Sequence, residues 1–125
     1  MIRRIRELSY VILLCDDLIE MEQFYTTVMQ FDIYARRTHW TELRVGSTLL
    51  ALQQRNNVSH GGGASGASVQ LAFRVAPDEV QDIEAYLVDN EVDFVHPTTN
   101  TDYGQRALSF RDPEGNILQI YADIA

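Results

Sequence analysis

The same order of predicted elements occurs twice in this chain, and this repetition constrains its fold more than any other feature. Each half begins with a run rich in branched and aromatic residues, continues with a helical pattern and ends with three further strand-like runs. Between the halves, residues 55–67 (RNNVSHGGGASGA) are rich in Gly and Ser and have no periodicity. That composition is typical of a flexible connector.

The first half reads as strand, helix and three strands. Residues 8–15 (LSYVILLC) predict the first strand, and Asp16 and Asp17 offer the side-chain oxygens that begin a helix. Apolar residues then recur at helical spacing, at Leu18, Met21, Tyr25 and Val28. The three strands are predicted at residues 31–36, 40–45 and 48–53.

The second half repeats this order. Residues 68–75 predict a strand, and Pro77 and Asp78 open a helix. The inward positions of that helix are Val80, Ile83 and Leu87. The strands that follow are predicted at residues 92–95, 105–111 and 117–121, with a DPEGN turn before the last one.

These patterns predict an α+β fold of two tandem βαβββ modules that form a curved eight-stranded mixed sheet with a concave ligand cleft. The length of 125 residues suits one domain. Within it, module one spans about residues 1–54 and module two about 68–125, with the linker at 55–67. Each module alone is too thin to bury its own sheet face, so both are needed.

Overlaying the two halves identifies equivalent positions. The first strands place Tyr10 on Gln70, and the final hairpin turns, Gly46-Ser47 and Gly115-Asn116, place Leu50 on Gln119. If Gln119 faces the cleft, these four positions face it together. Amide and phenol groups both donate and accept hydrogen bonds, so Tyr10, Gln70 and Gln119 suit the orientation of a ligand. Alternatively, they satisfy one another across a closed sheet interface.

Charge excludes several classes of function. Eighteen acids against ten bases give a net charge of −8, and every base is an arginine. Without lysine there is neither a phosphate-binding P-loop nor a Schiff-base nucleophile. An acidic chain repels a phosphate backbone, so nucleic acid is not an expected partner.

The sequence also bears on the cellular location of the protein. The longest apolar run, Val11 to Cys15, is far short of the roughly 20 residues of a membrane span. No leader pattern opens the chain, so we expect a cytoplasmic protein with no membrane partner. Cys15, the single cysteine, cannot form an internal disulfide and is expected to be buried.

Three segments together resemble the vicinal oxygen chelate superfamily: DDLIEMEQFYTTVMQF, VQLAFRV and FRDPEGNILQIY. That group includes glyoxalase I, extradiol dioxygenases, fosfomycin-resistance enzymes and bleomycin-resistance proteins. Its enzymes hold a divalent metal with His, Glu or occasionally Gln from four equivalent strand positions. Carried over, the resemblance puts these positions at Tyr10, Leu50, Gln70 and Gln119, where no His, Asp or Glu stands. Neutral groups leave the ionic charge uncompensated, so we expect no metal and no cofactor.

The histidines and two aromatic residues have other predicted roles. His39, His60 and His96 do not recur at ligand spacing and are expected on the solvent side, the last in a loop. Trp40 and Tyr103, at a strand edge and in a loop, could line the cleft and stack a flat or cationic ligand. Ordinary core filling is the equal alternative for both.

These observations favour a metal-free small-molecule-binding protein that sequesters or carries an aromatic or cationic ligand. Its predicted ligand-binding residues are Tyr10, Trp40, Leu50, Gln70, Tyr103 and Gln119, with no catalytic residue. The resemblance further implies a homodimer. The alternative is a lyase, isomerase or dioxygenase of the same fold with an atypical divalent-metal site. A third possibility is a protein-interaction module with a vestigial pocket.

Overall fold

The computed structural model describes residues 2–55 and 69–125. Contacts between residues group the chain into two compact units, Met1–Ser65 and Gly66–Ala125, and each unit is described by itself. Most of the predicted linker, together with His60, lies outside the described residues.

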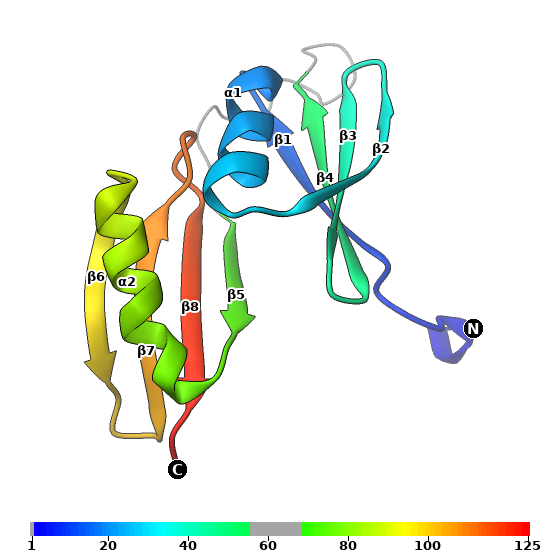
Figure 1. The fold of residues 1–125 in the computed structure, drawn as a ribbon. Coiled ribbons are helices and arrows are strands. Elements are labelled where there is room, and N and C mark those ends of the chain that lie inside the picture. Colours follow the sequence, from blue (N-terminus) through cyan, green and yellow to red (C-terminus); the bar gives the residue numbers. More distant parts are fainter. Residues whose placement is uncertain (1, 56–68) are drawn as a thin grey trace. The chain divides into compact units, whose positions relative to one another are not determined.

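The first unit is a four-stranded mixed sheet with one helix (Figure 1). Its strands are hydrogen-bonded in the order β1-β4-β3-β2, with β1 parallel to β4 and the other neighbours antiparallel. The elements are β1 (Tyr10–Cys15), α1 (Leu18–Gln23), β2 (Asp32–Arg37), β3 (Trp40–Val45) and β4 (Thr48–Gln54). A 3-10 turn, Ile2–Arg4, precedes them, and the π-helical turn Phe24–Val28 continues α1.

Helix α1 begins where the sequence predicts and covers one face of this sheet. The Asp17 carboxylate accepts a hydrogen bond from the Glu20 backbone N–H at 3.1 Å, which caps the first turn. Met21 and Tyr25 have no exposed surface. The buried residues of the sheet include Leu13, Cys15, Leu43 and Leu52, so the predicted burial of Cys15 is confirmed. Thr41 on β3 donates to Glu22 of α1 at 3.2 Å and marks this face as the helix side.

The second unit repeats the pattern. Its strand order is β5-β8-β7-β6, with β5 parallel to β8 and the other neighbours antiparallel. The elements are β5 (Gln70–Arg74), a 3-10 turn (Pro77–Glu79), α2 (Val80–Asp89), β6 (Asp93–Asn100), β7 (Gln105–Arg111) and β8 (Ile117–Asp123). The predicted α+β fold of two βαβββ modules is confirmed, and its eight strands are hydrogen-bonded as two four-stranded sheets.

The DPEGN turn between β7 and β8 is built around one buried carboxylate. Asp112 is 4% exposed and accepts hydrogen bonds from the backbone N–H groups of Glu114 and Asn116, at 2.9 and 3.0 Å. Its second oxygen accepts from the Asn116 side chain at 2.8 Å. Gly115 has a φ of +94°, which a residue with a Cβ rarely adopts. The predicted turn chemistry is therefore confirmed.

Strand β6 is the largest error in the predicted boundaries. The sequence predicts a strand over residues 92–95, but β6 runs from Asp93 to Asn100 and includes Pro97. Proline is tolerated here because β6 is the edge strand of its sheet, and its pairing with β7 shifts register on both sides of His96. The expectation that His96 lies in a loop is consequently wrong, although its side chain is exposed.

In the described part of the chain, no helix is long and apolar enough to cross a membrane.

Candidate functional site

Strand pairing corrects one of the predicted site positions. Gln119 is the register partner of Ala72, two residues after Gln70. In the first unit, the residue two positions after Tyr10 is Ile12, and its partner is Ala51 rather than Leu50. Leu50 is 3% exposed and lies on the helix side with Leu52, opposite to Tyr10. The turn overlay was therefore wrong by one residue, and in a strand a shift of one residue moves the side chain to the other face.

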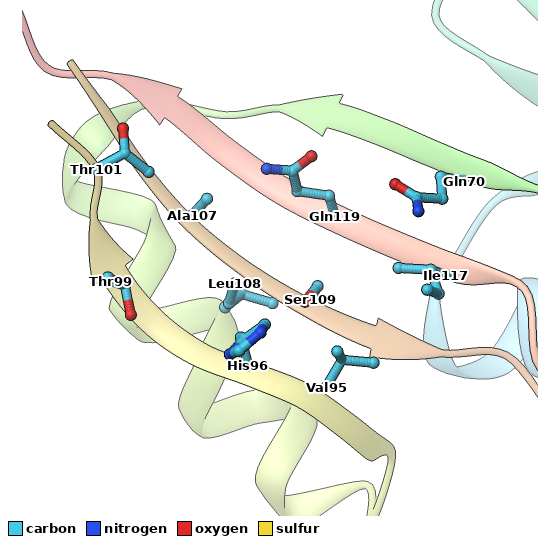
Figure 2. A pocket seen from close by; sticks show the side chains of 10 residues that line it. All are labelled: Gln70, Val95, His96, Thr99, Thr101, Ala107, Leu108, Ser109, Ile117 and Gln119. Atoms are coloured by element: carbon cyan, nitrogen blue, oxygen red, sulfur yellow. The ribbon is translucent and has the colours of Figure 1, made fainter. Parts of the chain in front are cut away.

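A hollow of about 430 Å³ lies on the second sheet, on the face turned away from α2 (Figure 2). All four strands of the sheet contribute to it. Among its lining residues are Gln70 from β5, Ile117 and Gln119 from β8, Ser109 from β7, and His96 and Thr99 from β6. The hollow belongs entirely to this unit.

The polar groups of this hollow are mainly amides and hydroxyls, set in a largely apolar lining. The side chains of Gln70 and Gln119 stand on neighbouring strands, and Ser109 is the register partner of Gln119 on the next strand (Figure 2). Each amide can donate two hydrogen bonds and accept others, and the hydroxyl can do both. Among the described residues that line the hollow, none is Asp, Glu or Arg, and His96 is the one titratable side chain.

A second cluster of side chains lies in the first unit, on the face of the sheet opposite α1. Glu42 is 1% exposed, and its Oε2 accepts hydrogen bonds from Trp40 Nε1 at 2.8 Å and from Arg37 at 3.1 Å. The Tyr10 hydroxyl is 3.5 Å from the same oxygen. The rings of Tyr10 and Trp40 meet edge to face with centroids 6.2 Å apart. We call these four residues the Glu42 cluster.

The structure thus divides the six predicted ligand-binding residues into groups. Gln70 and Gln119 line one hollow, and Tyr10 and Trp40 meet in the Glu42 cluster. Leu50 belongs to the core, and Tyr103 is 71% exposed between β6 and β7 and is not among the residues that line the hollow. His39 is exposed in a turn, with a φ of +62°, as expected of a solvent-side residue.

Two residues of interest were missed or undervalued by sequence reasoning. The proline after His96 predicts a loop at this position, so the sequence does not reveal that His96 belongs to strand β6. Glu42 follows Trp40 by two residues on β3, and this spacing already places both side chains on one face. Its contacts with Arg37 and Tyr10 come from other strands and have no local signal.

A divalent metal of the kind held by enzymes of this fold does not fit these residues. In residues 2–55 and 69–125, no group of three or more His, Cys, Asp and Glu side chains could hold a metal ion. The hollow offers amides, hydroxyls and the single imidazole of His96, whereas catalytic sites for such metals use several imidazole and carboxylate ligands together. Glu42 is the one carboxylate of the Glu42 cluster, and no imidazole or second carboxylate accompanies it there.

Comparisons with known proteins agree with this architecture. A metallothiol transferase, FosB of Staphylococcus epidermidis, is 22% identical over 122 residues, which cover 94% of this chain and 82% of that protein. The crystal structure of a glyoxalase/bleomycin resistance protein/dioxygenase from Nocardioides matches with a TM-score of 0.83 at 20% identity, over 95% of this chain and 84% of the other. Lactoylglutathione lyase from Agrobacterium tumefaciens matches with a TM-score of 0.79 at 20% identity, over 93% and 92% of the two chains.

At these identities the solved structures establish the fold alone. The family is established by sequence, since the model of the glyoxalase-like domain matches residues 8–125. This match spans both βαβββ modules, from β1 to the end of β8. The chain belongs to the glyoxalase-like domain family.

Proposed function

We propose that this chain is a metal-free small-molecule-binding protein of the glyoxalase/bleomycin-resistance type, which sequesters or carries an aromatic or cationic organic ligand. The observation that carries the proposal is the meeting of Gln70, Gln119 and Ser109 in one hollow on the second sheet. Three neutral groups that donate and accept hydrogen bonds suit the orientation of an organic ligand better than the activation of a water molecule.

Ligand size and polarity follow from the hollow. A volume of about 430 Å³ is within the range of small-molecule sites. Val95, Ala107 and Ile117 provide apolar surface beside the amides, so a flat ring with a polar edge satisfies both kinds of wall. A neutral amide or lactam matches the donor and acceptor pattern of a glutamine side chain.

The direct test replaces Gln119 with leucine and measures binding of a compound panel by NMR. The panel contains benzamide, nicotinamide, 2-pyridone and quinolin-2-one, with benzylammonium and benzamidinium as cations of similar size. We expect at least one compound to shift the side-chain amide signals of Gln70 and Gln119 saturably in the unchanged protein. Q119L is expected to weaken that compound about tenfold, because one ligand hydrogen bond of about 1.5 kcal/mol is lost.

Gln81 on α2 provides the matched control, since it is exposed and does not line the hollow. Q81L should leave the affinity unchanged. The proposal fails if no compound binds saturably and Q119L raises the melting temperature, because the hollow would then be a vestige with no ligand to orient.

A second candidate function is catalysis by the same fold. The observation that favours it is the pairing of His96 with Ser109, which are register partners and both line the hollow. Imidazole is the side chain that most often transfers protons in enzymes. The alternative of a lyase, isomerase or dioxygenase with an atypical divalent-metal site would in addition show the metal stoichiometry that is tested at the end of the Discussion.

The proposal includes a cytoplasmic homodimer without a nucleic-acid or membrane partner. The family resemblance supports the homodimer, and the net charge of −8 argues against a nucleic-acid partner. Light scattering in solution should give twice the mass of one chain, and a monomer would contradict this part of the proposal.

A further inference from the structure

Glu42 occupies an unusual place for a buried charge. Its side chain is 1% exposed, yet it stands on the sheet face that α1 does not cover, with Tyr10 and Trp40. A buried carboxylate is retained only when hydrogen bonds or an opposite charge offset its lost hydration. Trp40 supplies a neutral donor at 2.8 Å, so the positive charge comes from Arg37.

Arg37 is the solvent-exposed partner of this pair. Its guanidinium is 3.1 Å from Glu42, but its side chain is 67% exposed. Because most of the Arg37 side chain lies in solvent, its release from Glu42 restores rotamer freedom and removes little packing. A cation from solution that has the same charge and N–H donors keeps the buried carboxylate paired when it takes the place of Arg37.

The two aromatic rings favour a planar cation. Tyr10 is 39% exposed and meets Trp40 edge to face, at a centroid distance of 6.2 Å. Both residues stand on the same sheet face as the carboxylate. The register partner of Glu42 on β4 is Ala51, and those of Tyr10 and Trp40 are Leu49 and Gln53, each two residues from Ala51. Aromatic faces attract cations, and a guanidinium can stack on a ring while its N–H groups reach a carboxylate.

We infer that Glu42, Trp40 and Tyr10 form a binding site for a small guanidinium or amidinium cation, at which Arg37 is the resident competitor. The inference rests on the proposed function in that it concerns the binding of a cationic ligand. All of its contacts lie within the first unit, and none involves a residue of the hollow on the second sheet.

Trp40 reports on this site directly, because it is the only tryptophan in the sequence. The experiment titrates the R37A variant and the unchanged protein with ethylguanidinium chloride at constant ionic strength and follows tryptophan emission. Ethylurea, which has a similar shape and no charge, is titrated in parallel. We expect a saturable change with ethylguanidinium and none with ethylurea. If Arg37 occupies Glu42 about nine-tenths of the time, R37A should bind roughly tenfold more tightly than the unchanged protein.

Arg36 is the matched control. It is the neighbour of Arg37 on β2, its side chain is 62% exposed, and it pairs with Glu22 on the other face of the sheet. R36A should bind ethylguanidinium as the unchanged protein does. E42Q, with circular dichroism to verify folding, should lose the response, and should it not fold, the comparison of R37A with R36A decides alone.

Three results would overturn the inference. These are the absence of a saturable emission change in R37A, an equal response to ethylurea, and an equal gain in R36A. The proposed function is read separately, from the amide signals of Gln70 and Gln119. If the amide signals do not respond to any compound but Trp40 emission responds to ethylguanidinium, the proposed role of the hollow is wrong and the cation site stands. If the amide signals respond and Trp40 emission does not, the cation site alone is wrong.

Discussion

Replacing Asp112 with alanine is expected to lower the free energy of unfolding by about 4 kcal/mol. The Asp112 carboxylate accepts three hydrogen bonds at 2.8 to 3.0 Å, two of them from Asn116, which is itself 3% exposed. A buried donor that loses its partner costs about 1–3 kcal/mol, and D112A removes the partner of two such donors together. Equilibrium denaturation in urea measures the change.

The matched substitution is D102A, in the exposed connection between β6 and β7. That variant should stay within about 0.5 kcal/mol of the unchanged protein, as surface substitutions usually do. If D112A cost no more than D102A, the turn between β7 and β8 would not depend on the buried carboxylate, and this description of it would be wrong.

Replacing Leu50 with alanine is the second change with a large expected effect. Leu50 is 3% exposed on the helix side of the first sheet, where truncation leaves a cavity that its neighbours fill only in part. Leu-to-Ala changes at such positions cost about 2–5 kcal/mol. The neighbouring variant L49A should cost clearly less, because Leu49 is half-buried on the opposite face in register with Tyr10.

This pair of variants decides the register of the first sheet. Equal losses, or a larger loss in L49A, would mean that Leu50 faces away from α1. In that case the overlay of Leu50 on Gln119 would be restored, and Leu50 would return to the candidate ligand-binding residues.

Much of the fold could be predicted because its signals are local. Asp17 caps α1 from three residues away, and Asp112, Gly115 and Asn116 form their turn within five residues. Strand and helix periods distinguish the elements, and the order of those elements reveals the duplication. Family resemblance adds the same architecture independently.

The errors arise where local patterns are ambiguous. The overlay that placed Leu50 on Gln119 needed the exact length of each hairpin, and a one-residue difference reverses the face of a strand residue. Pro97 ended the predicted strand early because its tolerance depends on an edge position that only the assembled sheet reveals.

The directions of two candidate side chains could be predicted, whereas their role in binding stays a prediction. Alternation along β8 and β5 identified Gln119 and Gln70, which line one hollow. The Glu42 cluster could not be predicted, since Tyr10 and Glu42 are separated by 32 positions in the sequence and meet only through β4. Tyr103 is an aromatic residue of the kind that lines ligand sites, but its side chain is exposed. Aromatic character alone does not determine the direction of a loop side chain.

The central claim concerns the charge of the groups that face the hollow on the second sheet, and divalent metal content tests it most directly. The protein is purified without chelators and analysed by mass spectrometry for nickel, zinc, iron and manganese, then titrated with each ion by calorimetry. We expect no stoichiometric ion and no saturable binding, because Gln70, Gln119 and Ser109 offer no negative charge. One ion per chain, lost when Gln70 and Gln119 are both replaced by leucine, would contradict the account and favour an enzyme.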